Sequence, residues 1–176
     1  MLKTGPKAGD IISCAGIRLG IRWTILLLCC YIFSHCTLRM LPRDLATYIN
    51  RDIYGIVELE EIALSRYQEL TGDNYISDQA LRASLAAEII PVYSRFTGLV
   101  GKIRPQTKAV RKLHVIYRNA ASLRLQGFRT ILLAIDTQDP DLVHQANRML
   151  DQGQHLVTLW QGRLAQLSGQ YGLERQ

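Results

Sequence analysis

The most regular hydrophobic pattern lies near the end of the chain, where apolar or small residues recur every three or four positions. The series is Val143, Ala146, Leu150, Gly153, Val157, Trp160, Leu164, Leu167 and Tyr171. This spacing places the side chains on one face of an α-helix. Asp139 can act as the N-cap, and Pro140 suits the first helical position. The pattern therefore predicts a helix over residues 140–171.

Helical periodicity also runs through most of the chain before this helix. It predicts helices over residues 42–71, 77–103 and 105–136, with Ser77 as the N-cap of the second and Pro105 at the start of the third. Gly72 follows the first and suits a left-handed stop. Short connections between four long helices are typical of an antiparallel up-down-up-down bundle. We therefore expect an all-α fold with a four-helix bundle over residues 42–176.

Pro91 lies inside the second predicted helix, whose apolar positions are Leu81, Leu85, Val92, Phe96, Leu99 and Ile103. Proline has no N–H to donate to the carbonyl four residues earlier, which belongs to Ala87. We therefore expect a kink at this point.

Residues 1–41 form a separate basic segment around an uncharged run of 16 residues, from Trp23 to Leu38. We expect this run to be an N-terminal membrane-spanning helix, although it is short beside the usual ~20 residues. The alternatives are a cleaved secretory signal peptide and a buried soluble helix. Basic residues before the run modestly outnumber those after it, which predicts a single-pass protein with a cytoplasmic N-terminus and an extracytoplasmic bundle. Signal cleavage would instead give a secreted or periplasmic protein.

The cysteines and the net charge are concentrated in this segment. Its four cysteines are Cys14, Cys29, Cys30 and Cys36, so residues 42–176 can hold neither a disulfide framework nor an all-cysteine metal site. Residues 1–43 account for +5 of the +6 net charge. The remainder of the chain is near neutral, which disfavours a nucleic-acid-binding domain.

The near-neutral body nevertheless contains a strongly basic stretch. Residues 89–135 hold nine bases and no acid, whereas acids outnumber bases nine to three in residues 44–88 and five to three in residues 136–176. Helical placement puts one basic face opposite Val110, Tyr117 and Phe128. This basic face consists of Arg104, Lys108, Arg111, Lys112, Arg118 and Arg129, and the first five are the candidate docking residues. We interpret it as a solvated surface paired with acids of neighbouring helices; the alternative is a docking face for lipid headgroups or an acidic protein.

Three charged residues fall on the apolar side of the predicted helices. Counting from the loops places Glu88, Arg124 and a carboxylate of the first helix, Glu60 or its neighbours Glu58 and Glu61, at one depth. An unpaired buried charge is costly, so the sequence predicts a buried ionic layer of Glu88, Arg124 and Glu60. We assign it a structural role in fixing helix register, with proton handling or ligand binding as the alternative.

His114 also lies on an apolar face and is predicted to be a core histidine. No Glu-x-x-His pair of the di-metal bundle proteins occurs in the sequence. The nearest candidate ligands, Asp141, His144, Asp151 and His155, are predicted to face solvent. We expect no catalytic residues, no metal and no cofactor.

Together these observations predict a non-enzymatic protein, either membrane-tethered or exported. It would act as a docking or structural subunit of a membrane-associated complex, with other protein subunits as partners and no nucleic acid or small-molecule substrate. The alternative function is a metal- or cofactor-binding helical bundle that uses core polar residues such as His114.

Overall fold

The computed structural model describes residues 40–173, and all regular secondary structure in this part of the chain is helical. The predicted anchor or signal segment, including the run from Trp23 to Leu38, lies outside the described residues. Within residues 40–173, no helix combines the length and the hydropathy that are needed to cross a bilayer.

The helices of residues 40–173 form four long rods. In the first rod, helical residues 40–47 continue into the π-helix η1 (Tyr48–Ile53) and α2 (Tyr54–Gln68). A 3₁₀ turn, η2 (Gly72–Asn74), follows, and Gly72 has the expected left-handed backbone, with φ of 63°. The second rod comprises α3 (Asp78–Ser84), the π-helix η3 (Leu85–Ile89) and α4 (Ile90–Val100). The third and fourth rods are α5 (Lys108–Thr137) and α6 (Pro140–Gln170).

Local sequence signals explain where most of these helices begin. The Ser77 hydroxyl accepts a hydrogen bond from the Ala80 N–H, and the Asp139 carboxylate accepts one from the Asp141 N–H. Both are N-cap interactions that satisfy otherwise unpaired donors of the first turn. The third helix begins at Lys108 rather than at Pro105, because Thr107 is its N-cap.

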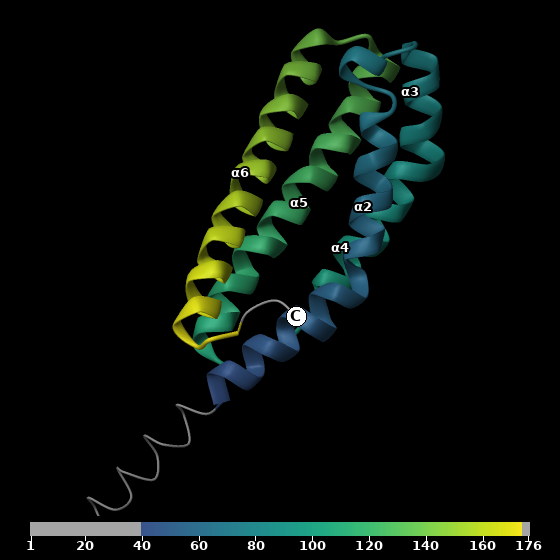
Figure 1. The fold of residues 1–176 in the computed structure, drawn as a ribbon. Helices are drawn as coiled ribbons and strands as arrows, with labels where there is room; N and C mark the ends of the chain where they lie inside the picture. The colour runs from purple at the N-terminus through teal and green to yellow at the C-terminus, as the bar shows by residue number, and fades with distance from the viewer. Residues whose placement is uncertain (1–39, 174–176) are drawn as a thin grey trace, which may run out of the picture. The chain divides into compact units, whose positions relative to one another are not determined.

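The four rods pack side by side, and α5 lies against both α6 and α4, while α2 lies against α4 (Figure 1). The core between them is rich in aromatic rings. Tyr93 contacts Phe96 and Phe128 with ring centroids 5.2 Å apart in each pair, and Tyr67 lies 5.0 Å from Phe128. The described part is therefore a helical bundle with one continuous core.

The second rod does not keep the face that its periodicity predicts. Its buried residues are Leu81, Leu85, Ile89, Tyr93, Phe96 and Val100. After Leu85, the buried residues Ile89, Tyr93 and Val100 take the places predicted for Glu88, Val92 and Leu99. The buried face is therefore displaced by one position along the chain. The π-helix η3 explains the displacement, since its i→i+5 hydrogen bonds widen the turn just before Pro91, which cannot donate. The predicted irregularity at Pro91 is thus a wide turn that changes which residues face the core.

Candidate functional site: a buried polar network

A hydrogen-bonded ion pair occupies the interior of the bundle. Arg124 on α5 donates from Nη1 to Oε1 of Glu60 on α2 at 2.7 Å. Both residues are 7% exposed. Tyr93 on α4 donates to the same oxygen at 3.1 Å, and Tyr117 on α5 donates to Oε2 at 2.6 Å. The Glu60 carboxylate therefore links three of the four rods.

The fourth rod joins the network through Arg124. Its Nη2 donates to Oε1 of Gln154 on α6 at 2.5 Å. The neighbouring Gly153 makes room for the arginine, because a Cβ at position 153 would lie only 2.8 Å from Arg124 Cγ. Real Cβ atoms essentially never approach that closely. The Arg124 side chain can therefore take its observed conformation only because residue 153 has no side chain.

A second polar cluster lies beside the first. Trp160 donates from Nε1 to the Tyr48 hydroxyl at 3.2 Å, and that hydroxyl lies 3.4 Å from Nδ1 of His114. An indole N–H can only donate, so the Tyr48 oxygen is the acceptor of that bond and its hydrogen is free to go to His114. Trp160 also stacks on Tyr117 with centroids 4.5 Å apart. This stacking joins the two clusters into one network.

Burial shifts the pKa values of two tyrosines and one histidine in this network. It raises the pKa of the Tyr117 and Tyr93 hydroxyls far above the usual value, and the negative charge of Glu60 adds to the effect. Both phenols therefore remain protonated donors at any physiological pH. The pKa of His114 is lowered, chiefly by burial and then by the positive charge of Arg118. A neutral imidazole with Nδ1 as an acceptor matches the contact with Tyr48.

The structure brings together two of the three residues of the predicted ionic layer. Glu60 and Arg124 are in direct contact, but the placement of Glu88 in this layer was wrong. Glu88 is exposed and accepts a hydrogen bond from Arg66 Nε at 2.8 Å. The wide turn of η3 explains the error, because it directs Ile89 inward in place of Glu88.

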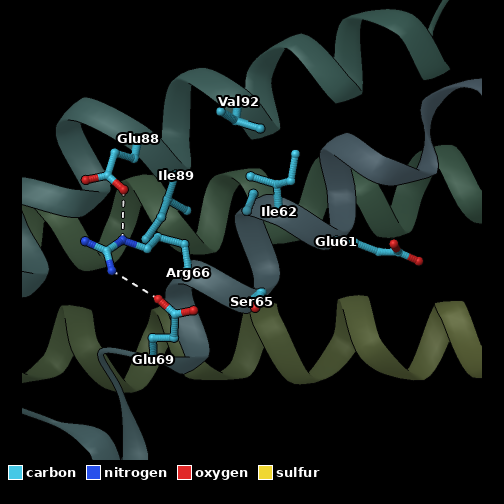
Figure 2. Close-up of a pocket in the computed structure, with 9 residues that line it drawn as sticks. Glu61, Ile62, Ser65, Arg66, Glu69, Glu88, Ile89 and Val92 are labelled. Carbon is cyan, nitrogen blue, oxygen red and sulfur yellow. Dashed lines mark hydrogen bonds and ion pairs between the residues drawn. The ribbon is translucent and has the colours of Figure 1, made fainter.

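Figure 2 shows the surroundings of Glu88, a hollow of about 460 Å³ between α2 and the second rod. Arg66 lies between Glu88 and Glu69 and pairs with both. Apolar side chains such as Ile89 and Val92 also line the hollow. Three of the charged side chains that line it, Arg66, Glu69 and Glu88, are thus paired with one another at the surface.

The predicted basic face is exposed along its whole length, at Arg104, Lys108, Arg111, Lys112 and Arg118. In residues 40–173 none of the five forms an ion pair with an acid. Arg104 instead donates to the carbonyls of Gly101 and Ile103, and Arg111 donates to that of Gln106. The expected pairing of this face with acids of neighbouring helices is therefore wrong for the part of the chain that the structure describes.

The remaining predicted residues are the histidines and the possible metal ligands on α6. His114 is buried, at 6% exposure, whereas His144, Asp151 and His155 lie on the exposed side of α6. Over residues 40–173, no three His, Cys, Asp or Glu side chains converge as metal ligands.

A groove of about 900 Å³ runs between the first rod and the end of α6, with Ile49 and Leu164 in its lining.

Sequence reasoning missed several members of the network. The sequence predicts core positions for Tyr117 and Trp160 but no polar roles, and it does not distinguish Tyr48, Tyr93 or Gln154. Regular helical periodicity does not predict the burial of Tyr93, because the buried face of the second rod is displaced at η3. The available signal was Tyr117, a phenol on an apolar face near the depth of Arg124.

The network is closed on itself. Each Glu60 oxygen is bonded, Arg124 has acceptors on two helices, and the Tyr48 hydroxyl contacts both Trp160 and His114. Among buried side-chain nitrogen and oxygen atoms of residues 40–173, the hydroxyl of Ser84 is the one without a partner.

In comparisons with protein-family models, curated proteins and solved structures, the chain showed no match.

Proposed function

We propose that this chain is a non-enzymatic, membrane-tethered helical-bundle protein that serves as a docking or structural subunit of a membrane-associated complex. In this proposal the run from Trp23 to Leu38 anchors the protein. The N-terminus is cytoplasmic and the bundle is extracytoplasmic, in keeping with the distribution of basic residues around the run.

The observation that carries the proposal is the basic face on and next to α5. Five exposed bases follow one another over residues 104–118, and in the described part of the chain no acid forms an ion pair with them. A continuous surface of one charge attracts an anionic partner and orients it. This is a property expected of a docking surface.

The polar core supports a structural role for the interior. Its hydrogen bonds connect residues of all four rods, from Glu60 on α2 to Gln154 on α6. Buried polar groups of this kind require particular partners, and such a requirement can fix the register of neighbouring helices. A bundle with fixed register presents its surface residues in a constant arrangement.

The tether is tested by membrane extraction of the full chain. We expect the protein to stay in the membrane pellet after an alkaline carbonate wash and to be released by detergent. Leu27→Arg, in the middle of the apolar run, should shift the protein toward the soluble fraction because a charge at the bilayer centre is costly. Leu142→Arg on α6 is the control that should not change the fractionation. Quantitative release of the unaltered chain by carbonate would contradict the tether.

The docking role is tested on the detergent-solubilised protein from its native membranes. We expect native electrophoresis to show an assembly larger than the single chain in its micelle, and Arg111→Glu with Arg118→Glu to reduce that assembly. A single chain that carries a stoichiometric metal or chromophore would instead favour the metal- or cofactor-binding alternative.

A further inference from the structure

We infer that the end of the bundle near residue 40 binds the anionic headgroups of a lipid bilayer through Arg104, Lys108, Arg111 and Lys112. These four residues are called the basic end below. The inference rests on the proposed tether and deepens it, because it names the anionic surface that the basic face meets.

The first argument is position within the bundle. The Asp44 carboxylate, on the first turns of the first rod, accepts hydrogen bonds from the Gln106 N–H at 2.9 Å and the Thr107 N–H at 2.8 Å. It also accepts one from the Thr107 hydroxyl at 2.7 Å. Residue 44 lies about 6 Å along a helix from residue 40. The start of α5 is therefore fixed beside the start of the described chain (Figure 1).

The second argument is the unpaired charge at this end. All four side chains are exposed, and so are Arg43 and Lys102. Asp44 contributes one negative charge to this region, where it accepts three hydrogen bonds at the start of α5, and the six exposed bases outnumber it. Arg104 and Arg111 bond to backbone carbonyls, which leaves their positive charge uncompensated. Bases that lie close together attract anionic lipid headgroups electrostatically, and in the proposed topology these headgroups belong to the extracytoplasmic leaflet.

The third argument favours lipid over an acidic protein. One residue, Arg39, separates Met40 from the apolar run that ends at Leu38. If that run is in the bilayer, the chain at Met40 is next to the headgroup layer. Electrostatic attraction to a surface acts over roughly 8–10 Å at physiological ionic strength. The basic end thus lies at the bundle end that the proposed tether holds closest to the lipid charges.

The experiment measures how readily an amine-acetylating reagent modifies Lys108 and Lys112 in the full chain, reconstituted in nanodiscs of neutral or of anionic phospholipid. Arg148→Lys supplies a reporter at an exposed position on α6, far from the basic end. We expect acetylation of Lys108 and Lys112 to fall at least about fivefold in anionic nanodiscs, with recovery at high salt. The reporter at position 148 should be acetylated equally in both lipids. Equal acetylation of Lys108 and Lys112 in both lipids would overturn the inference.

Two charge-matched variants show whether the protection belongs to this end. Arg104→Glu with Arg111→Glu should restore acetylation of both lysines in anionic nanodiscs, whereas Arg129→Glu with Arg148→Glu should leave the protection intact. Loss of protection in both variants would point to nonspecific attraction and contradict the inference. So would protection found in native membranes but not in pure lipid, since it would indicate an acidic protein.

The proposed tether and this inference can fail separately. If the full chain does not enter nanodiscs, the tether fails, and the same acetylation is measured with the free chain on anionic vesicles. Protection of Lys108 and Lys112 there would still support lipid binding by the basic end. Its absence would remove both proposals.

Discussion

At the scale of single residues, Glu60 has three hydrogen-bond donors, and this explains how a carboxylate is held in the core. Its donors lie 33, 57 and 64 residues away along the chain, at Tyr93, Tyr117 and Arg124. Desolvation of a carboxylate and a guanidinium is costly, and their attraction offsets the cost only when the geometry is good and their remaining groups are bonded. The arrangement meets both conditions.

We expect the two charges of this pair to depend strongly on each other. Glu60→Leu and Arg124→Met should each lower the free energy of unfolding by about 3–5 kcal/mol, because each leaves one buried charge unpaired. The double variant should lose clearly less than the sum, since it buries no charge. Urea unfolding of residues 40–176 measures all three, with Arg66→Met, at an exposed ion pair, as a control of small effect. Additive losses would show that the two charges do not interact.

His114 makes the stability of the bundle sensitive to acid. Its pKa is lowered in the folded protein, so the unfolded chain binds more protons as the pH falls below the ordinary histidine value of about 6.5. Stability should therefore decrease from pH 7.5 toward pH 5, and the decrease should stop below the folded-state pKa. Chemical unfolding across this range should show a shallower dependence for His114→Asn. His155→Asn, at an exposed position, is the matched control.

At the scale of helices, the approach of α5 and α6 depends on glycine. A Cβ at Gly153 would meet Ala120 O at 3.3 Å as well as the Arg124 stem, and a Cβ at Gly127 would meet Leu150 Cδ2 at 2.7 Å. These two positions, one on each helix, allow the backbones to come close. The packing of this helix pair is thus coupled to the placement of Arg124.

Substitution of glycine on α6 should therefore have opposite effects at two positions. Gly153→Ala should lower the free energy of unfolding by about 1–3 kcal/mol because the added methyl group overpacks the interface. Gly162→Ala meets nothing within 4 Å and should raise it by up to about 1 kcal/mol through helix propensity. Thermal and urea unfolding of the two variants compare the effects directly. Stabilisation by both substitutions would contradict the steric role of Gly153.

The two π-helical segments decide which faces of their rods are buried. In the first rod, Tyr48 and Ile53 are both buried although they are five positions apart, which a regular α-helix would not favour. In the second rod, η3 moves Glu88 to the surface and Tyr93 to the core. Both changes affect the polar network, since Tyr48 and Tyr93 are members of it.

At the scale of the whole molecule, three arrangements of charge stand apart from the surface ion pairs. One part flanks the apolar run of residues 23–38, a second is the buried pair of Glu60 and Arg124, and the third is the exposed basic face. The proposed tether concerns the first part and the headgroup-binding inference concerns the third. The body's near-neutral sum thus conceals a surface that is strongly basic at the end near residue 40.

The sequence by itself determined the features that local physical chemistry controls. The all-helical character of residues 40–173, the N-caps at Ser77 and Asp139 and the left-handed Gly72 depend on residues a few positions apart. The contact of Arg124 with Glu60 could also be anticipated, because a charge on an apolar face must find a partner at its own depth. The exposure of the basic face followed from helical periodicity in the same way.

Only the tertiary structure decided which of several similar residues the network uses. Glu88 is exposed because the phase of the second rod changes at η3, whereas Glu60 on α2 is buried and is the carboxylate that Arg124 contacts. The bond from Trp160 to Tyr48 joins residues 112 positions apart. No local pattern can specify that pairing, since it exists only when the four rods have assembled around a shared core.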